Sequence, residues 1–253
     1  MSAPLSILPL PVLLLAGTGE ARALAGRLAD DPRFAVTASL AGAVERPEAY
    51  PVRVRIGGFG GAQGLGTWLR GEGIAAVIDA THPFAARISA NAVAASLATG
   101  IPLLRLERPA WQAGPGDDWY EVVDLEEAAA RLPQGARPFL AVGRKEISRF
   151  SPRRDLDCLM RMIDPPEPGM LLPPGHLVLA RPSRDVDAEV ALLEQHGATH
   201  LVTKNSGGPW GEAKLLAARR LGLPVIIVRR PDLAGGEAVA DVPAALAWLE
   251  ARL

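Results

Sequence analysis

Short apolar runs alternate with helix-like segments along almost the whole chain, and this alternation restricts the fold more than any other feature. Val12 to Ala16 is apolar, and after Gly17-Thr18-Gly19 it is followed by Glu20 to Ala29, which has helical spacing. The apolar runs have the length and composition of buried parallel strands. The repeated order of strand and helix therefore predicts an α/β fold with doubly wound parallel sheets.

Further strands are expected at residues 34–40, 52–56, 74–78, 102–106, 119–123, 138–142, 158–163, 177–180, 201–203 and 224–228. The segment Pro133-Gln134-Gly135 has the composition of a linker, and the pattern restarts after it. We therefore predict two domains, residues 1–133 and 134–253, with no sequence repeat between them.

The composition excludes several classes of protein. The chain has 253 residues, of which 49% are hydrophobic, so it can bury a large core. Its formal net charge of −1 argues against a nucleic-acid binder, and no apolar run reaches the length of a membrane span. Cys158 is the single cysteine, which excludes an internal disulfide and a cysteine-rich metal site. A cytoplasmic location is the default expectation.

The most informative motif is the run from Asp79 to Ala85, Asp-Ala-Thr-His-Pro-Phe-Ala, which follows the apolar residues 74–78. Pro83 suits the first turn of the helix expected next. Asp79, Thr81 and His82 should thus lie at the carboxyl end of a strand, the edge where open α/β sheets bind ligands. His82 is a candidate base, proton donor or ligand contact, although a buried or capping structural role is equally open. No second His or Cys nearby offers metal-ligand spacing, so we predict no metal site.

Two glycine-rich turns are candidate cofactor loops. Gly17-Thr18-Gly19 begins a dinucleotide fingerprint, but Arg22 stands where the third glycine belongs, and a purely structural turn remains open. Strand two ends in Ser39 and Leu40 rather than in an acid, which disfavours NAD and leaves room for a 2′-phosphate, with Arg46 the nearest basic candidate. Gly57-Gly58-Phe59-Gly60-Gly61 lets a ligand approach backbone closely, unless it is only a flexible linker.

Basic and aromatic residues follow other strands. Arg108 can bind a carboxylate and Trp111 can stack on a flat ligand, or both can belong to a surface ion pair and a packed core. Arg144 and Lys145 follow the strand at 138–142. Lys204, with Asn205, Ser206 and Gly207, resembles an anion cradle but lacks the spacing of a Walker loop.

Together these motifs, in this order, resemble the precorrin-6A reductase family (cobalt-precorrin-6A reductases), NADPH-dependent enzymes of cobalamin biosynthesis. The resemblance covers nearly the whole chain and is most specific in the Asp79–Ala85 and Gly57–Gly61 runs. It implies two Rossmann-like domains with an active-site cleft between them. It implies NADPH on the N-terminal domain and hydride transfer to a C=C bond of precorrin-6A, giving dihydro-precorrin-6.

The resemblance and the motifs together give the site expected here. His82 is the candidate catalytic residue. The cofactor-binding candidates are Gly17, Thr18, Gly19, Ser39, Gly42, Arg46, Gly57, Gly58, Phe59, Gly60, Gly61 and Thr81. The substrate-binding candidates are Arg108, Trp111, Arg144, Lys145, Lys204, Asn205, Ser206 and Gly207. After Ala41-Gly42 many relatives are expected to have Arg where this chain has Ala43, which leaves the 2′-phosphate contact open.

Two alternatives remain. A short-chain dehydrogenase needs Tyr-x-x-x-Lys, but Tyr50 and Tyr120 are followed four positions later by Val54 and Asp124, which disfavours that class among other NAD(P) enzymes. A non-catalytic nucleotide or tetrapyrrole-binding module stays open. The expected partner is a small-molecule tetrapyrrole, with or without cobalt, received from other enzymes of the pathway.

Overall fold

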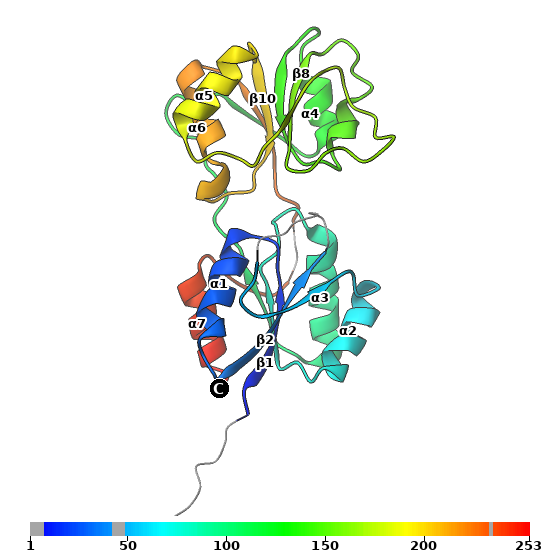
Figure 1. Cartoon of the computed structure of the whole chain (residues 1–253), viewed down its shortest axis with the longest axis vertical. Coiled ribbons are helices and arrows are strands. Elements are labelled where there is room, and N and C mark those ends of the chain that lie inside the picture. Colours follow the sequence, from blue (N-terminus) through cyan, green and yellow to red (C-terminus); the bar gives the residue numbers. More distant parts are fainter. Residues whose placement is uncertain (1–7, 42–48, 233–234) are drawn as a thin grey trace, which may run out of the picture. The chain divides into compact units, whose positions relative to one another are not determined.

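A computed structural model describes residues 8–41, 49–232 and 235–253 of the chain (Figure 1). These residues form two compact α/β units. Unit 1 contains the described residues up to Arg108 and again from Pro231 onward, and unit 2 is Pro109–Arg230. Each unit has its own six-stranded sheet, and every strand pair in both sheets is parallel.

The sheet of unit 1 has the strand order β12-β5-β4-β1-β2-β3. Its strands are β1 (Leu10–Leu15), β2 (Phe34–Leu40), β3 (Arg53–Ile56), β4 (Ala76–Asp79), β5 (Leu103–Leu106) and β12 (Glu237–Val239). Its helices are α1 (Gly19–Ala29), α2 (Gly61–Gly71), α3 (Ala86–Thr99) and α7 (Val242–Glu250). Figure 1 shows α1 and α7 on one face of this sheet and α2 and α3 on the other.

The sheet of unit 2 has the order β6-β11-β10-β7-β8-β9. Its strands are β6 (Trp119–Val122), β7 (Pro138–Ala141), β8 (Cys158–Met162), β9 (Gly175–Leu179), β10 (His200–Lys204) and β11 (Val225–Val228). Its helices are α4 (Leu125–Arg131), α5 (Val186–Gln195) and α6 (Ala213–Leu221), with the short 3₁₀ helices η1 (Ile147–Phe150) and η2 (Pro209–Gly211).

The apolar pattern of β1 explains why its sheet is covered on both faces. Val12 and Leu14 belong to one buried cluster, which includes Leu24 of α1, whereas Leu13 and Leu15 belong to another, which includes residues of α2 and α3. Burying one such leucine contributes about 1.5–3 kcal/mol. The continuous apolar run thus correctly predicted a parallel, doubly covered sheet.

Each sheet has one point where the strand order reverses. In unit 1 the chain leaves β1 toward β2 and β3, then crosses to β4 on the other side of β1. In unit 2 it leaves β7 toward β8 and β9, then crosses to β10 on the other side of β7. Ligands of open α/β sheets bind outside the carboxyl ends of the strands at such switch points.

The predicted domain boundary at residue 133 needs correction. β6 and α4, expected in the first domain, belong to unit 2, because β6 pairs with β11. β12 and α7, expected in the second domain, belong to unit 1, because β12 pairs with β5. Local patterns predict that a segment is a strand, but they do not say which sheet it joins, and these strands join the sheet of the other half of the sequence.

Two smaller differences concern α3 and the membrane. α3 begins at Ala86, after an N-cap residue without a side-chain cap bond, so Pro83 precedes the helix instead of occupying its first turn. No helix in the described part of the chain combines the length and apolarity that a bilayer span requires.

Candidate active site

At the switch point of unit 1, the loop after β1 is tied to the loop after β4. Thr18 is the N-cap of α1, where its hydroxyl accepts a hydrogen bond from the Ala21 amide (3.1 Å) and donates one to the Ala80 carbonyl (2.8 Å). Gly17 has φ +134°, a conformation that favours glycine, and a Cβ there would meet no protein atom within 4 Å. The first amides of α1 lack intrahelical partners and carry the positive end of the helix dipole, so this turn is suited to a phosphate.

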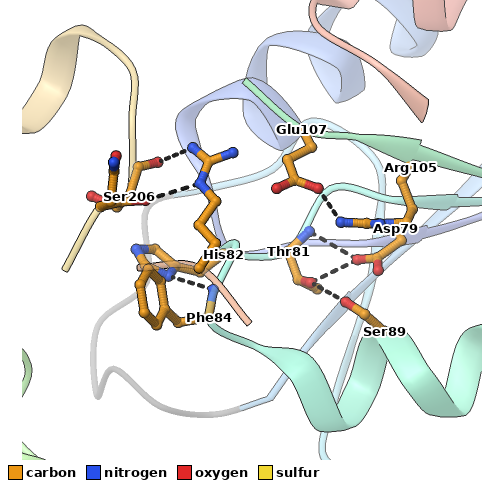
Figure 2. A network of polar contacts seen from close by, with 10 residues as sticks. Asp79, Thr81, His82, Phe84, Ser89, Arg105, Glu107 and Ser206 are labelled. Atoms are coloured by element: carbon orange, nitrogen blue, oxygen red, sulfur yellow. Dashed lines mark hydrogen bonds and ion pairs between the residues drawn. The ribbon is translucent and has the colours of Figure 1, made fainter. Parts of the chain in front are cut away.

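The loop after β4 is held by its own polar side chains (Figure 2). Asp79 is buried and accepts hydrogen bonds from the amide (3.1 Å) and hydroxyl (2.6 Å) of Thr81, whose hydroxyl also lies 3.4 Å from that of Ser89. Arg105, beside Asp79 in the sheet, is ion-paired with Glu107. Asp79 and Thr81 therefore shape the loop and do not cap α3, which was the alternative reading.

His82 lies in this loop, half-buried, and its ring is 5.8 Å from that of Phe84. Its Nδ1 accepts a hydrogen bond from the Phe84 amide at 3.2 Å (Figure 2). An accepting Nδ1 carries no hydrogen, so the neutral ring has its hydrogen on Nε2. His82 is thus a hydrogen-bond donor at the ligand edge of β4, as the motif predicted, while its part in chemistry remains a proposal.

The glycine-rich loop between β3 and α2 owes its composition first to backbone conformation. Gly57, Gly60 and Gly61 have φ of +114°, +78° and +90°, where side chains are disfavoured, and a Cβ at any of them would meet no protein atom within 4 Å. Phe59 packs edge-on against Trp68, with 5.3 Å between ring centroids, so its ring is partly committed to α2. The loop is therefore ordered rather than a flexible linker, and backbone is accessible in it.

Arg55, at the end of β3, was missed by the sequence analysis and organises this loop. Its guanidinium lies 3.8 Å from the Phe59 ring centroid and donates hydrogen bonds to the Ser39 hydroxyl and to the carbonyls of Gly57 and Gly58. Burial lowers the pKa of the Arg55 guanidinium. The signal in the sequence was an arginine two positions before a glycine run, in a strand that otherwise looks like a plain solvent-facing edge.

Arg108, predicted to bind a substrate carboxylate, is already ion-paired within unit 1. Its Nη1 lies 2.8 Å from Oε2 of Glu20, and both side chains are largely buried. Glu20 stands in the first turn of α1, where its charge would repel a phosphate, and Arg108 neutralises it. Glu20 was not foreseen, because a charge pair 88 positions apart leaves no local signal.

Three predicted cofactor residues follow β2. Ser39 is buried and lies opposite both Leu15 of β1 and Arg55 of β3 in the sheet register. Gly42 and Arg46 lie outside the described residues.

In unit 2, the switch point brings together the loops after β7 and β10. Lys204 at the end of β10 donates to Glu146 at 2.5 Å, and Glu146 follows the predicted Gly143-Arg144-Lys145 turn. Arg144 bonds the carbonyl of Pro165 (3.1 Å) and approaches Glu167 (3.5 Å), whereas Lys145 is exposed. The cationic groups predicted after β7 and β10 thus gather at one edge, with Glu146 as an unforeseen member.

The rest of the predicted anion cradle has structural roles. The amides of Asn205 and Ser206 donate to the carbonyls of Val228 and Lys204, so they are not presented to an anion. The Asn205 side chain, buried, makes two hydrogen bonds to the backbone of Trp111. A Cβ at Gly207 would lie 2.1 Å from the Pro109 carbonyl, so close packing requires that glycine.

Trp111 is a core residue more than a stacking platform. It is buried in the main cluster of unit 2, and its indole donates to the Gly208 carbonyl at 2.9 Å. Lys214 lies 4.7 Å from the ring centroid. Part of the ring lines a pocket of about 370 Å³ beside α6, together with Trp119 and Arg219.

Neither a reactive thiol nor a cluster of metal ligands contributes to these edges. Cys158 is buried in β8, and burial raises the pKa of its thiol to about 12, which makes it a poor nucleophile. Across residues 8–41, 49–232 and 235–253, no three His, Cys, Asp or Glu side chains come together as a metal site.

Comparison with known proteins gives one family. Residues 11–250 match the family described as "Precorrin-6x reductase CbiJ/CobK". The precorrin-6A reductase of Rhodococcus erythropolis is 49% identical over 240 residues (94% of this chain, 96% of the relative), and that of Rhodobacter capsulatus is 47% identical over 239 residues (94% and 95%). The cobalt-precorrin-6A reductase of Priestia megaterium is 34% identical over 241 residues (89% and 92%). A solved structure described as "CobK precorrin-6A reductase" superposes with a TM-score of 0.90 at 46% identity, covering 95% of this chain and 96% of that one. With the family matched from residue 11 to residue 250, the chain belongs to the precorrin-6x reductases.

Proposed function

We propose that this protein transfers hydride from NADPH to a C=C bond of precorrin-6A, forming dihydro-precorrin-6 in cobalamin biosynthesis. Family membership carries the coarser part of this proposal, a reductase of the cobalamin pathway. The Thr18–Ala80 switch point of unit 1, with its glycine turns, supports the finer part, a dinucleotide as the source of reducing equivalents.

The residues of unit 1 fit a dinucleotide. The Gly17 turn and the first amides of α1 are suited to the pyrophosphate, and the ordered loop Gly57–Gly61 offers backbone to the nicotinamide half. When bound, NADPH supplies the hydride, so the protein must orient both reactants, hold anionic groups and manage one proton. Thr81 and His82, at the end of β4, are proposed to contact the reactants.

The substrate carries acetate and propionate side chains, which call for cationic partners. Lys204, Arg144 and Lys145 supply such groups in unit 2, and Arg108 supplies one in unit 1. Asn205, Ser206, Gly207 and Trp111 contribute by holding the loop that carries Lys204. We propose that Lys204 exchanges its bond to Glu146 for a substrate carboxylate.

The decisive experiment is to mix the purified protein with precorrin-6A and NADPH and to follow the absorbance of the reduced nicotinamide. We expect NADPH oxidation that depends on both the macrocycle and the protein. Binding of NADPH and the macrocycle without oxidation would instead support the non-catalytic binding module.

The metal-free macrocycle is the preferred substrate in this proposal. The curated relatives named precorrin-6A reductase are 46–49% identical to this chain, whereas those named cobalt-precorrin-6A reductase are 29–34% identical. A parallel assay with cobalt-precorrin-6A tests this: we expect the higher kcat/KM with the metal-free form.

A further inference from the structure

Arg55 is distinguished from the other arginines near the carboxyl ends of unit 1 by the nature of its partners. Its guanidinium contacts the Ser39 hydroxyl (2.9 Å), the carbonyls of Gly57 (2.8 Å) and Gly58 (3.1 Å), and the face of Phe59. All of these groups are neutral. By contrast, Arg105 is paired with Glu107, and Arg108 is paired with Glu20.

A partly buried cation without a carboxylate is unusual, because desolvating a charge is costly unless an opposite charge is near. Within the described residues, no Asp or Glu forms an ion pair with Arg55. A guanidinium has five N–H donors, of which the three printed contacts use three. Arg55 therefore retains both charge and donor capacity for an anion.

The position of Arg55 indicates which anion it meets. Ser39 lies between Leu15 and Arg55 in the register of three adjacent strands, so Arg55 and Ser39 stand at the carboxyl end of β2, beside the strand that leads into the Gly17 turn. In dinucleotide-binding sheets, the end of β2 contacts the adenosine ribose. An acid there selects the 2′-hydroxyl of NAD, whereas an arginine nearby accommodates the 2′-phosphate of NADP.

We propose that Arg55, held by Ser39, binds the 2′-phosphate and sets the preference of this enzyme for NADPH over NADH. This inference rests on the proposed function, since it presupposes a dinucleotide at the Gly17 turn. It replaces Arg46, the basic candidate from the sequence, with a residue whose guanidinium is fixed by four contacts. The Arg55 carbonyl clamps also make it a support of the Gly57–Gly61 loop, so the test must separate specificity from loop integrity.

The test is calorimetric titration of wild type, Arg55→Gln, Arg55→Lys and Arg53→Gln with 2′,5′-ADP and 5′-AMP, and with NADPH and NADH. The first pair isolates the 2′-phosphate without any reaction. In Arg55→Gln we expect roughly 10- to 100-fold weaker binding of 2′,5′-ADP and NADPH, the range for a charge-assisted phosphate contact, with 5′-AMP and NADH nearly unchanged. Arg55→Lys, which keeps the charge but not the planar fork, should fall in between.

Arg53→Gln is the matched control. Arg53 lies two residues earlier on the same face of β3 and pairs with Glu72 on the surface, so its loss should leave all four affinities as in wild type. Equal weakening of 2′,5′-ADP and 5′-AMP in Arg55→Gln would reduce Arg55 to a loop support and overturn the inference. An unchanged preference would overturn it as well. A wild type that binds neither NADPH nor 2′,5′-ADP would instead refute the proposed cofactor site itself.

Discussion

The two units share one strand order but differ after the first strand of that order. The orders β12-β5-β4-β1-β2-β3 and β6-β11-β10-β7-β8-β9 correspond strand for strand, so β1 matches β7 and β4 matches β10. After β1, a Gly-Thr-Gly turn leads into the 11-residue helix α1. After β7, Gly143-Arg144-Lys145 leads only into η1, a 3₁₀ helix of 4 residues.

This difference separates two ways of holding an anion. Unit 1 offers the capped N-terminus of a full helix, whose amides and dipole suit a phosphate. Unit 2 has no such helix after β7 and instead gathers Arg144, Lys145 and Lys204, whose mobile cations suit carboxylates at varied positions. The comparison therefore favours the dinucleotide on unit 1 and the carboxylates of the macrocycle on unit 2.

The largest expected effect concerns His82, which follows β4 where Lys204 ends β10. A C=C reduction by hydride also needs a proton at the neighbouring carbon, and His82 is the proposed donor. His82→Ala should lower kcat roughly 10²-fold or more, the usual contribution of a general acid. In wild type, kcat should fall on the alkaline side as the donor loses its proton, and the variant should lack that fall.

The contact of His82 with Phe84 sharpens this test. Donation of the proton by an imidazolium would require the Nδ1 bond to the Phe84 amide to open, whereas a merely orienting role keeps that bond. His176→Ala, an exposed histidine on β9, is the control and should behave as wild type. A near-normal kcat in His82→Ala would leave water as the proton source.

The next effect tests the phosphate site of unit 1. Gly19 opens α1, next to the N-cap Thr18, so a branched side chain there would block backbone approach by a phosphate. Gly19→Val should weaken NADPH binding roughly 10- to 100-fold, the value of one or two hydrogen bonds to a charged group. Calorimetry measures this, and circular dichroism confirms that the variant is folded. Unchanged affinity would move the phosphate site away from α1.

A smaller effect is expected for the carboxylate partners. Lys204→Ala and Arg108→Ala should each raise KM for the macrocycle roughly tenfold, as for a partly exposed ion pair, and leave the Kd of NADPH nearly unchanged. Arg149→Ala, which removes an exposed surface pair with Glu126, is the control. Loss of NADPH affinity in Lys204→Ala would break the division of roles between the units.

The sequence allowed the fold class to be predicted because the pattern is local. Buried runs such as Val12 to Ala16 became strands of parallel sheets, and the loops carrying His82, Gly57 and Lys204 all follow strands. The exchange of β6 and β12 between the sheets was not predictable, because it depends on pairing between segments far apart in the sequence. The internal repeat of strand order likewise exists in the topology and not in the residues.

The site was predictable in its position but not in its partners. The glycines of Gly57–Gly61 were recognised, while the arginine that holds them was not, because an Arg in an exposed strand normally signals only solvent. Asn205 and Gly207 looked like ligand groups, yet their side chain and missing side chain serve packing. Sequence reveals unusual residue types, but only tertiary contacts show whether the protein already uses them.

The smallest effect compares one paired carboxylate in each unit. In unit 2, Asp117 accepts two hydrogen bonds from Arg219 (2.8 and 2.7 Å) and one from the Gly114 amide (2.8 Å), and Arg219 chiefly holds the pKa of Asp117 below its usual range. In unit 1, Arg33 likewise lowers the pKa of Asp31, but that pair lies at the surface.

A carboxyl group whose pKa is lower in the folded state stabilises the protein above the unfolded-state value of about 3.9, and this stabilisation disappears as the pH falls through the folded-state pKa. Asp117→Asn should therefore lower the free energy of unfolding by about 1 kcal/mol at pH 7, a modest value because Arg219 is partly exposed. The difference from wild type should shrink below pH 4. Asp31→Asn should change stability little at either pH. Urea unfolding at pH 7 and pH 3 measures both variants, and a difference for Asp117→Asn that persists at pH 3 would mean that shape, and not charge, makes this contact stabilising.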